Sequence, residues 1–153
     1  MPQSPELVFA FEVTAQIGAP QDVGVTPHGR RRIIPVLGGS FTGPAIRGRI
    51  LPGGADWQIL RADGTAELDA RYTLEADDGA LIYVSNRGMR SGPPDVLARL
   101  NAGEIVDPGA YYFRTVAQFE TGAPAYQWLT QAIFIAAAER YPDRVVIRFW
   151  RVM

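Results

Sequence analysis

The sequence predicts an all-β fold with a minor helical part, built as a closed or nearly closed antiparallel β-barrel of about eight or nine strands. Segments in which apolar and polar residues alternate recur along the chain, and Gly, Pro and Asp residues separate them. No long crossover segment, of the kind that parallel strands need, lies between them. Closure into a barrel would also remove the exposed strand edges that an open sheet must protect.

The alternating segments give the expected strands in chain order. They are residues 7–13, 32–37, 41–51, 56–61, 65–76, 80–90, 111–120, 131–138 and 144–152. Glycine-containing turns at residues 38–39, 52–54, 63–64 and 78–79 separate several of them and supply the positive φ angles of tight hairpins. The two Asp-Gly pairs, at 63–64 and 78–79, are the strongest hairpin signals.

One short amphipathic helix is expected over residues 93–100. Pro and Asp stand at its start, and Val96, Leu97 and Leu100 follow at the spacing of one helical face. A second helical turn is expected around residues 125–130. Helices are therefore a minority of the fold.

The composition limits the number of domains and the available chemistry. We expect residues 1–153 to form one domain, because this length builds a single hydrophobic core. The chain has no Cys and no Lys, and its only histidine is His28. Disulfides, thiolate zinc sites, iron–sulfur clusters, Cys nucleophiles and Schiff-base lysines are thereby excluded. We expect no metal and no cofactor.

The charge pattern bears on partners and location. A formal charge of −1 and a pI near 5.8 give no overall attraction to phosphate backbones, so we expect no nucleic-acid partner. The amino terminus lacks the basic start and the continuous apolar stretch of a secretory signal. The longest apolar run, residues 132–138, is too short to span a membrane as a helix. These features predict a cytoplasmic protein without a membrane partner.

Alternation assigns the side chains of each strand to two faces. In residues 65–76 and 111–120 the charged residues all fall on one face and most of the apolar residues on the other. In one interpretation the polar face meets solvent and the apolar face fills the barrel. In the other, part of the polar face looks into a lumen, since a barrel of eight or nine strands has room for one small ligand.

Residues 132–138 differ because they are apolar on both faces. Such a strand must be covered on its outer side as well, either by the helix or by another subunit. An apolar outer patch on a small barrel is typical of association. We therefore expect a homo-oligomer.

Asp56 and Trp57 follow the Pro-Gly-Gly turn at residues 52–54. A carboxylate and an indole at the start of a strand could offer a ligand a polar group and a stacking surface, but a capped turn beside a core Trp explains them equally well.

The string at residues 38–43 fails as a serine-hydrolase elbow, because Thr42 stands where a glycine is needed.

Several short strings carry a family resemblance through their order and spacing. They are residues 38–44 (GGSFTGP), 51–57 (LPGGADW), 68–72 (LDARY), 77–80 (DDGA), 112–115 (YFRT), 119–121 (FET) and 128–129 (WL). As a set they resemble the domain-of-unknown-function 3237 family of small bacterial and fungal proteins, from about Phe9 to the end of the chain. The resemblance implies a single β-barrel of calycin-like or allene-oxide-cyclase-like shape, often an oligomer, and it implies no reaction.

The resemblance also suggests pocket residues at the positions that match its strings. These candidates are Asp56, Trp57, Arg71, Tyr72, Asp78, Arg114 and Glu120. Tyr112 and Trp128 complete the predicted ligand-binding set. Family members usually have Asn where this chain has Thr130, so no role is transferred to that position.

We expect a barrel that binds a small organic molecule in its lumen, as a carrier or as a cofactor-free isomerase or cyclase. A cyclase of this kind can act by holding a reactive substrate in one conformation, so it needs neither nucleophile nor metal. Acid–base catalysis would fall to Asp56, Glu120 or a tyrosine, because arginine stays protonated. The alternative is a non-catalytic assembly module with a filled interior, which forms a homo-oligomer through its outer apolar strands.

Overall fold

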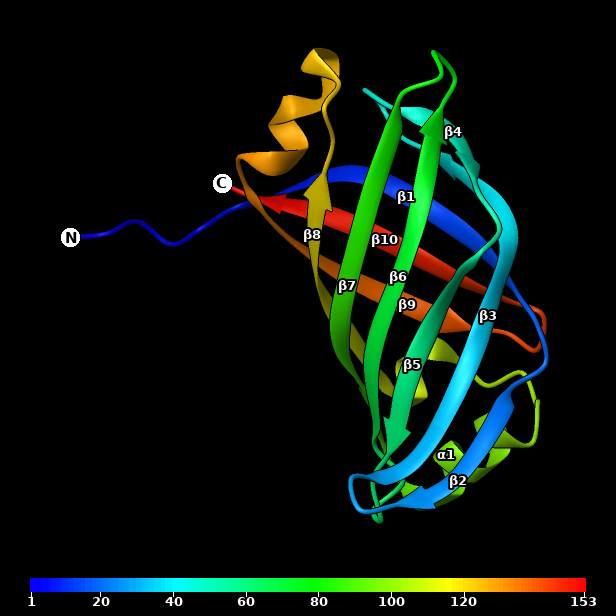
Figure 1. The fold of residues 1–153 in the computed structure, drawn as a ribbon. Coiled ribbons are helices and arrows are strands. Elements are labelled where there is room, and N and C mark those ends of the chain that lie inside the picture. The colour runs from blue at the N-terminus through cyan, green and yellow to red at the C-terminus, as the bar shows by residue number, and fades with distance from the viewer.

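Ten strands form one continuous antiparallel sheet in the computed structural model, which describes residues 1–153 (Figure 1). They are β1 (Leu7–Ile17), β2 (Gln21–Thr26), β3 (Gly29–Thr42), β4 (Arg47–Ile50), β5 (Gly54–Leu60), β6 (Ala66–Ala76), β7 (Leu81–Ser91), β8 (Tyr112–Glu120), β9 (Ile133–Arg140) and β10 (Arg144–Val152). The helical parts are α1 (Pro94–Asn101) and the 3-10 turns η1 (Pro108–Ala110) and η2 (Pro124–Thr130). No helix is long and apolar enough to cross a membrane.

The sheet closes on itself where β1 pairs with β3. From β1 the ring runs through β10, β9, β8, β7 and β6 to β3, with β4 and β5 both pairing between β6 and β3. Strand β2 pairs only with β3 and extends outside the ring. The predicted closed antiparallel barrel is confirmed, with an eight-stranded ring and two extra strands.

The predicted tight turn at Gly38 and Gly39 is wrong. Both glycines lie inside one long strand, which pairs with β5 in its first half and with β4 and β1 in its second. A Cβ atom on Gly39 would lie 2.0 Å from the carbonyl oxygen of Thr14 in β1. The glycine therefore permits a close approach of two backbones where the barrel closes, and its φ of +139° also suits a residue without a side chain.

The helical predictions agree with the structure. Helix α1 lies at one end of the barrel (Figure 1). It covers nearly the predicted span, buries Val96, Leu97 and Leu100, and contacts the β5–β6 turn at Gly64. The turn η2 coincides with the second predicted helical segment. Strand β2 is not among the predicted strands, because its residues are mostly exposed and pair on one side only.

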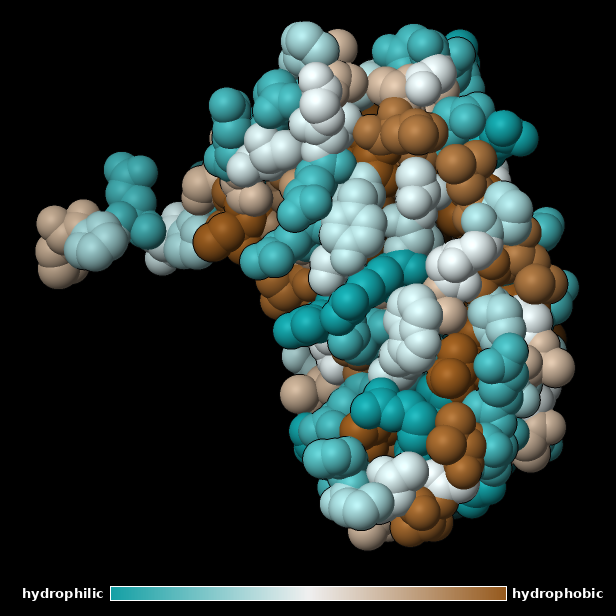
Figure 2. Space-filling model, in the orientation of Figure 1, coloured by the Kyte–Doolittle hydropathy of each residue, from teal (hydrophilic) through white to brown (hydrophobic).

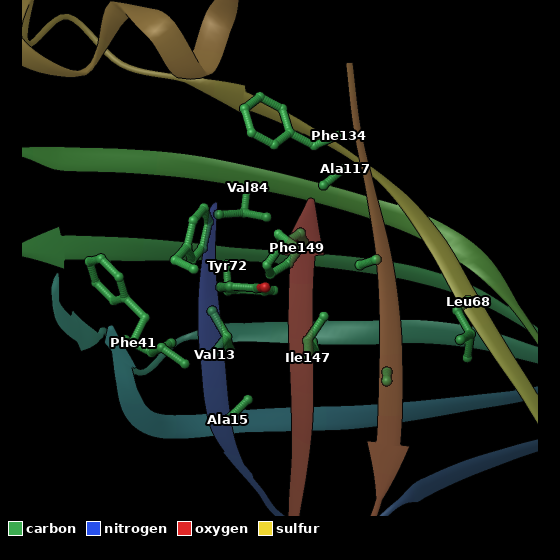
Figure 3. Packing of buried hydrophobic residues seen from close by; sticks show 14 of the residues in the cluster. Val13, Ala15, Phe41, Leu68, Tyr72, Val84, Ala117, Phe134, Ile147 and Phe149 are labelled. Atoms are coloured by element: carbon green, nitrogen blue, oxygen red, sulfur yellow. The ribbon is translucent and has the colours of Figure 1, made fainter. Parts of the chain in front are cut away.

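Aromatic side chains fill one half of the barrel. Phe11 stacks on Phe149 with ring centroids 4.8 Å apart, and Phe119 meets Phe134 edge-on at 5.2 Å. Figure 3 shows Phe41, Phe134 and Phe149 pointing into the barrel from different strands. These aromatic contacts pack this half of the interior.

We predict that Gly39→Ala destabilises the protein by about 2–5 kcal/mol, because the new methyl group meets the β1 backbone at a positive φ angle. Chemical denaturation of the purified variant measures this. Gly122→Ala is the matched control, because a Cβ atom there has open space around it. Equal stability of the two variants would contradict the proposed closure constraint.

Candidate functional site

A cavity occupies the half of the barrel opposite the phenylalanine cluster. Its cavity volume is about 70 Å³ for the centre of a water-sized sphere, within about 620 Å³ of space between atoms that includes solvent at its mouth. Ten of its 16 lining residues are hydrophobic. The polar ones are Asp56, Gln58, Asn86, Arg90, Thr115 and Arg140.

Strand register explains why these polar side chains meet. Residues paired directly across antiparallel strands share a face. Asp56 pairs with Ile34 and with Ala70, and Ala70 pairs with Asn86, so all four point inward with the cavity-lining residues. By the same register Arg90 faces inward beside Phe113, and Arg140 beside Val145. Arg32 pairs with Gln58 and therefore lies on the same inner face.

Asp56 is the only carboxyl group in the cavity lining. One of its oxygens accepts a hydrogen bond from Gln58 Nε2 at 2.9 Å, and the other accepts one from the backbone N–H of Asp69 at 2.9 Å. Burial raises the pKa of Asp56, and these two hydrogen bonds oppose that rise only in part. The carboxyl is thus fixed in position and holds its proton more readily than an exposed aspartate.

Three arginines surround this carboxyl. Arg90 is only 3% exposed and lies over the Phe113 ring, 5.6 Å from its centroid. Burial lowers the pKa of Arg90 to about 9 and also lowers the pKa values of Arg32 and Arg140. Since a pKa of about 9 still lies above neutral pH, Arg90 carries its charge there.

Several buried polar atoms in and beside the cavity have no hydrogen-bond partner in the protein. They are Arg32 Nε and Nη2, Gln58 Oε1, Tyr72 Oη, Asn86 Oδ1 and Thr115 Oγ1. A buried polar atom without a partner costs stability, and native proteins contain few of them. Their concentration around one cavity indicates a surface built to exchange hydrogen bonds, as donor and as acceptor, with something other than the protein.

The structure divides the predicted ligand-binding set. Asp56 and Tyr72 line the cavity. Six of the others are exposed on the outer surface: Trp57, Arg71, Asp78, Tyr112, Arg114 and Glu120. Trp128 lies in η2 and packs beside Phe134, in the filled half.

Side-chain alternation causes this division. Trp57 and Arg71 follow or precede cavity residues by one position, so they point to the opposite side of the sheet. The interpretation in which the polar faces of residues 65–76 and 111–120 look into the lumen is therefore wrong, and those faces meet solvent. Figure 2 shows the corresponding hydrophilic band across the middle of β6 and β7, where Arg71 and Arg87 form ion pairs with Asp69.

Of the two catalytic candidates, Asp56 lies in the cavity and Glu120 does not. Glu120 is exposed at the end of β8, where it pairs with Tyr83 in the filled half. Its predicted catalytic role has no support from the geometry of the lumen.

Sequence reasoning missed five polar cavity residues, and it favoured a surface position for Arg32, which the register places on the inner face. The five are Gln58, Asn86, Arg90, Thr115 and Arg140. Asn86 and Arg90 continue the inward face that Ile82 and Val84 begin. Polar residues that interrupt an otherwise apolar face were the signal that could have found them.

The fold and the cavity define a class: a small antiparallel barrel with one filled half and one hollow, polar half. The family model described as "Protein of unknown function (DUF3237)" matches residues 5–152. The chain belongs to this family, as its short sequence strings predict.

Similar proteins agree in sequence and fold. A "UPF0311 protein" from Rhodopseudomonas palustris is 50% identical over 148 residues, which are 97% of each chain. A conserved protein of unknown function from R. palustris has a solved structure with a TM-score of 0.95, 48% identity and full coverage of both chains. A "beta-barrel like protein" from Acinetobacter baumannii gives a TM-score of 0.88 at 40% identity, covering 100% of this chain and 99% of the other.

A more distant structure shares the fold alone. It is described as an enzyme from Penicillium herquei, with a TM-score of 0.75, 20% identity, and coverage of 100% of this chain and 98% of the other. The fold is therefore found in a protein described as an enzyme.

We predict that the stability of the wild type falls relative to that of Asp56→Asn as the pH rises above about 4 towards neutrality. A raised pKa in the folded state means that the unfolded chain loses this proton first, so stability present at low pH is lost as the pH rises through the folded pKa. Thermal unfolding at a series of pH values measures the difference.

Asp78→Asn is the control with the opposite sign. The backbone N–H of Ala80 and the Tyr126 hydroxyl lower the pKa of Asp78, so the wild type should gain relative to this variant as the pH rises from about 2 to 4. Parallel pH profiles for wild type and Asp56→Asn would contradict the raised pKa.

Proposed function

We propose that the protein binds a small organic molecule in the hollow half of its barrel and acts on it as a cofactor-free isomerase or cyclase. The observation that carries this proposal is the cavity itself, whose apolar walls surround a fixed carboxyl group and several polar atoms without protein partners. Mostly apolar walls with a few convergent polar groups are typical of small-molecule sites.

The chemistry that we assign to the cavity is proton transfer to or from a held substrate. Asp56 is the candidate acid–base group, because its raised pKa brings its proton closer to exchange near neutral pH. Its two hydrogen bonds fix the direction of the carboxyl. Arg90 stays charged and can polarise a substrate oxygen without exchanging a proton. The walls would supply the rest of the catalysis by restricting the substrate to a reactive conformation.

We predict that filling the cavity abolishes binding. Ala70 lines the cavity between Asp56 and Asn86, so Ala70→Phe places a ring where the ligand would lie. Arg71→Met is the matched control, since the adjacent side chain points outward. Ligands found by native mass spectrometry with the wild type should bind Arg71→Met and not Ala70→Phe. Equal binding to Ala70→Phe would remove the cavity as the site.

A turnover assay on those ligands separates an enzyme from a carrier. Isomerisation and cyclisation conserve mass, so the product is followed by chromatography and NMR. We expect Asp56→Asn to retain binding and to lose roughly 10²- to 10⁴-fold in rate, the usual contribution of a general acid or base. If the wild type binds a ligand but leaves it chemically unchanged, the proposed catalysis is contradicted and the protein is a carrier.

Assembly is a second candidate function, favoured by the outer face of β8 and β9. Val116 is 52% exposed and Ile133 is 65% exposed, and beside them Met89, Tyr112 and Ile135 line a shallow groove. Helix α1 packs at the barrel end near Gly64 and not over this face. We propose that a second copy of the chain covers it. Light scattering tests this proposal on the wild type, on Val116→Arg, and on Gln118→Arg as a control on the same strand. We expect the wild type to associate and Val116→Arg to lose that association. A monomeric wild type would contradict the proposal.

A further inference from the structure

We propose that the cavity ligand is an organic anion, whose carboxylate or similar charged group is held by Arg32, Arg90 and Arg140 while its carbon body lies against the apolar walls. This inference rests on the proposed small-molecule site and names the class of molecule that it takes.

The first support is the charge balance of the lumen. Three guanidinium groups face the inside of the barrel, against the single carboxyl of Asp56. Arg32 and Arg140 lie close enough to Arg90 for their charges to disfavour its protonated form. The arrangement places an excess of positive charge in a partly buried, mostly apolar space, where an unpaired charge is unfavourable.

The second support is that none of these arginines forms a close ion pair with a carboxylate of the protein, although Asp56 attracts all three at longer range and Asp22 attracts Arg32. The structure contains nine ion pairs, and none includes Arg32, Arg90 or Arg140. The nine paired arginines lie at the surface, where an ion pair contributes little. Arginines are thus left unpaired where pairing matters most, and Nε and Nη2 of Arg32 are buried with no acceptor at all.

Asp56 does not fill this role. Its two oxygens accept hydrogen bonds from Gln58 and from the Asp69 backbone, and it forms no ion pair. Burial also raises the pKa of Asp56. Because Asp56 is hydrogen-bonded elsewhere and pairs directly with none of the three arginines, their guanidinium groups are left for a bound anion to pair with.

The walls show that this molecule is organic. Ile34, Leu68, Phe113 and Ile147 contribute apolar surface that an inorganic anion would leave uncovered. Gln58 Oε1 and Asn86 Oδ1 are buried acceptors without donors, which suits a ligand that also carries hydroxyl groups. A small carboxylic acid with an apolar body, and with hydroxyl groups on it, meets each of these requirements.

The test compares acids with their neutral amides. Benzoate and hexanoate, the corresponding primary amides, and inorganic phosphate are titrated into the wild type by calorimetry. We expect each acid to bind at least about tenfold more tightly than its amide, because hydrogen bonds between charged groups are stronger than neutral ones. The preference should disappear in Arg90→Met and persist in Arg114→Met. Arg114 is a matched control because it also lies over an aromatic ring, at 5.4 Å from the Tyr112 centroid, but on the outer face.

The possible failures separate this inference from the proposed function. If acids and amides bind equally, and Ala70→Phe blocks both, the lumen is a small-molecule site but the anion assignment is wrong. Phosphate binding as tight as that of benzoate overturns the organic character of the anion. If neither acid binds at millimolar concentration, the inference fails, and the native mass spectrometry described above decides separately whether the cavity binds a neutral compound.

The ligand-free variants give a second readout. Because Met removes a buried, unpaired charge and fills similar volume, Arg90→Met should raise the Tm of the free protein, and Arg114→Met should not. Arg140→Met provides a second cavity variant if Arg90→Met folds poorly. A lowered Tm in both cavity variants, together with an unchanged preference for acids, would assign these arginines a structural role and overturn the inference.

Discussion

Pairing of β1 with β3 is the contact on which the rest of the structure depends, because it turns a long sheet into a closed ring. The two backbones approach so closely at Gly39 that no side chain fits between them. Once the ring is closed, every inward-facing residue of eight strands shares one interior. Residues as distant in sequence as Arg32 and Arg140 then become neighbours.

The interior is divided unequally between stability and binding. The half that contains Phe11, Phe119 and Phe149 is packed by aromatic contacts and supplies much of the hydrophobic core. The other half keeps unpaired polar atoms and three unpaired arginines, which lower the stability of the free protein. Such an arrangement is typical of binding sites, where groups are held ready for a ligand at a cost to folding. The hydrophobic cluster runs from the filled half into the cavity walls and supplies the stability that offsets this cost.

Much of the fold could be predicted from local pattern, and the exceptions have local causes. Alternation located most strands, and Pro94 with the apolar spacing of Val96, Leu97 and Leu100 located α1. The sequence predicts a turn at Gly38-Gly39, because glycine permits both a tight turn and a close backbone approach. Only the partner strand distinguishes the two. Strand β2 has no buried face and therefore leaves no hydrophobic pattern.

The site was less accessible to sequence reasoning. Family strings pointed to Asp56 and Tyr72, but they also pointed to Arg71 and Trp57, which sit one position away and face solvent. Alternation does assign Asn86 and Arg90 to the inward face of their strand. That these residues meet Asp56 and Arg140 follows only from the register of the closed ring.

The most direct measurement follows the arginine side chains by NMR while benzoate is added to the ¹⁵N-labelled protein. The Nε–Hε signals, assigned with the Met variants, report on each guanidinium separately. We expect the signals of Arg90 and Arg140 to shift and saturate, while that of Arg114 stays in place. Saturable shifts confined to surface arginines, with Arg90 and Arg140 unmoved, would contradict an anion site inside the barrel.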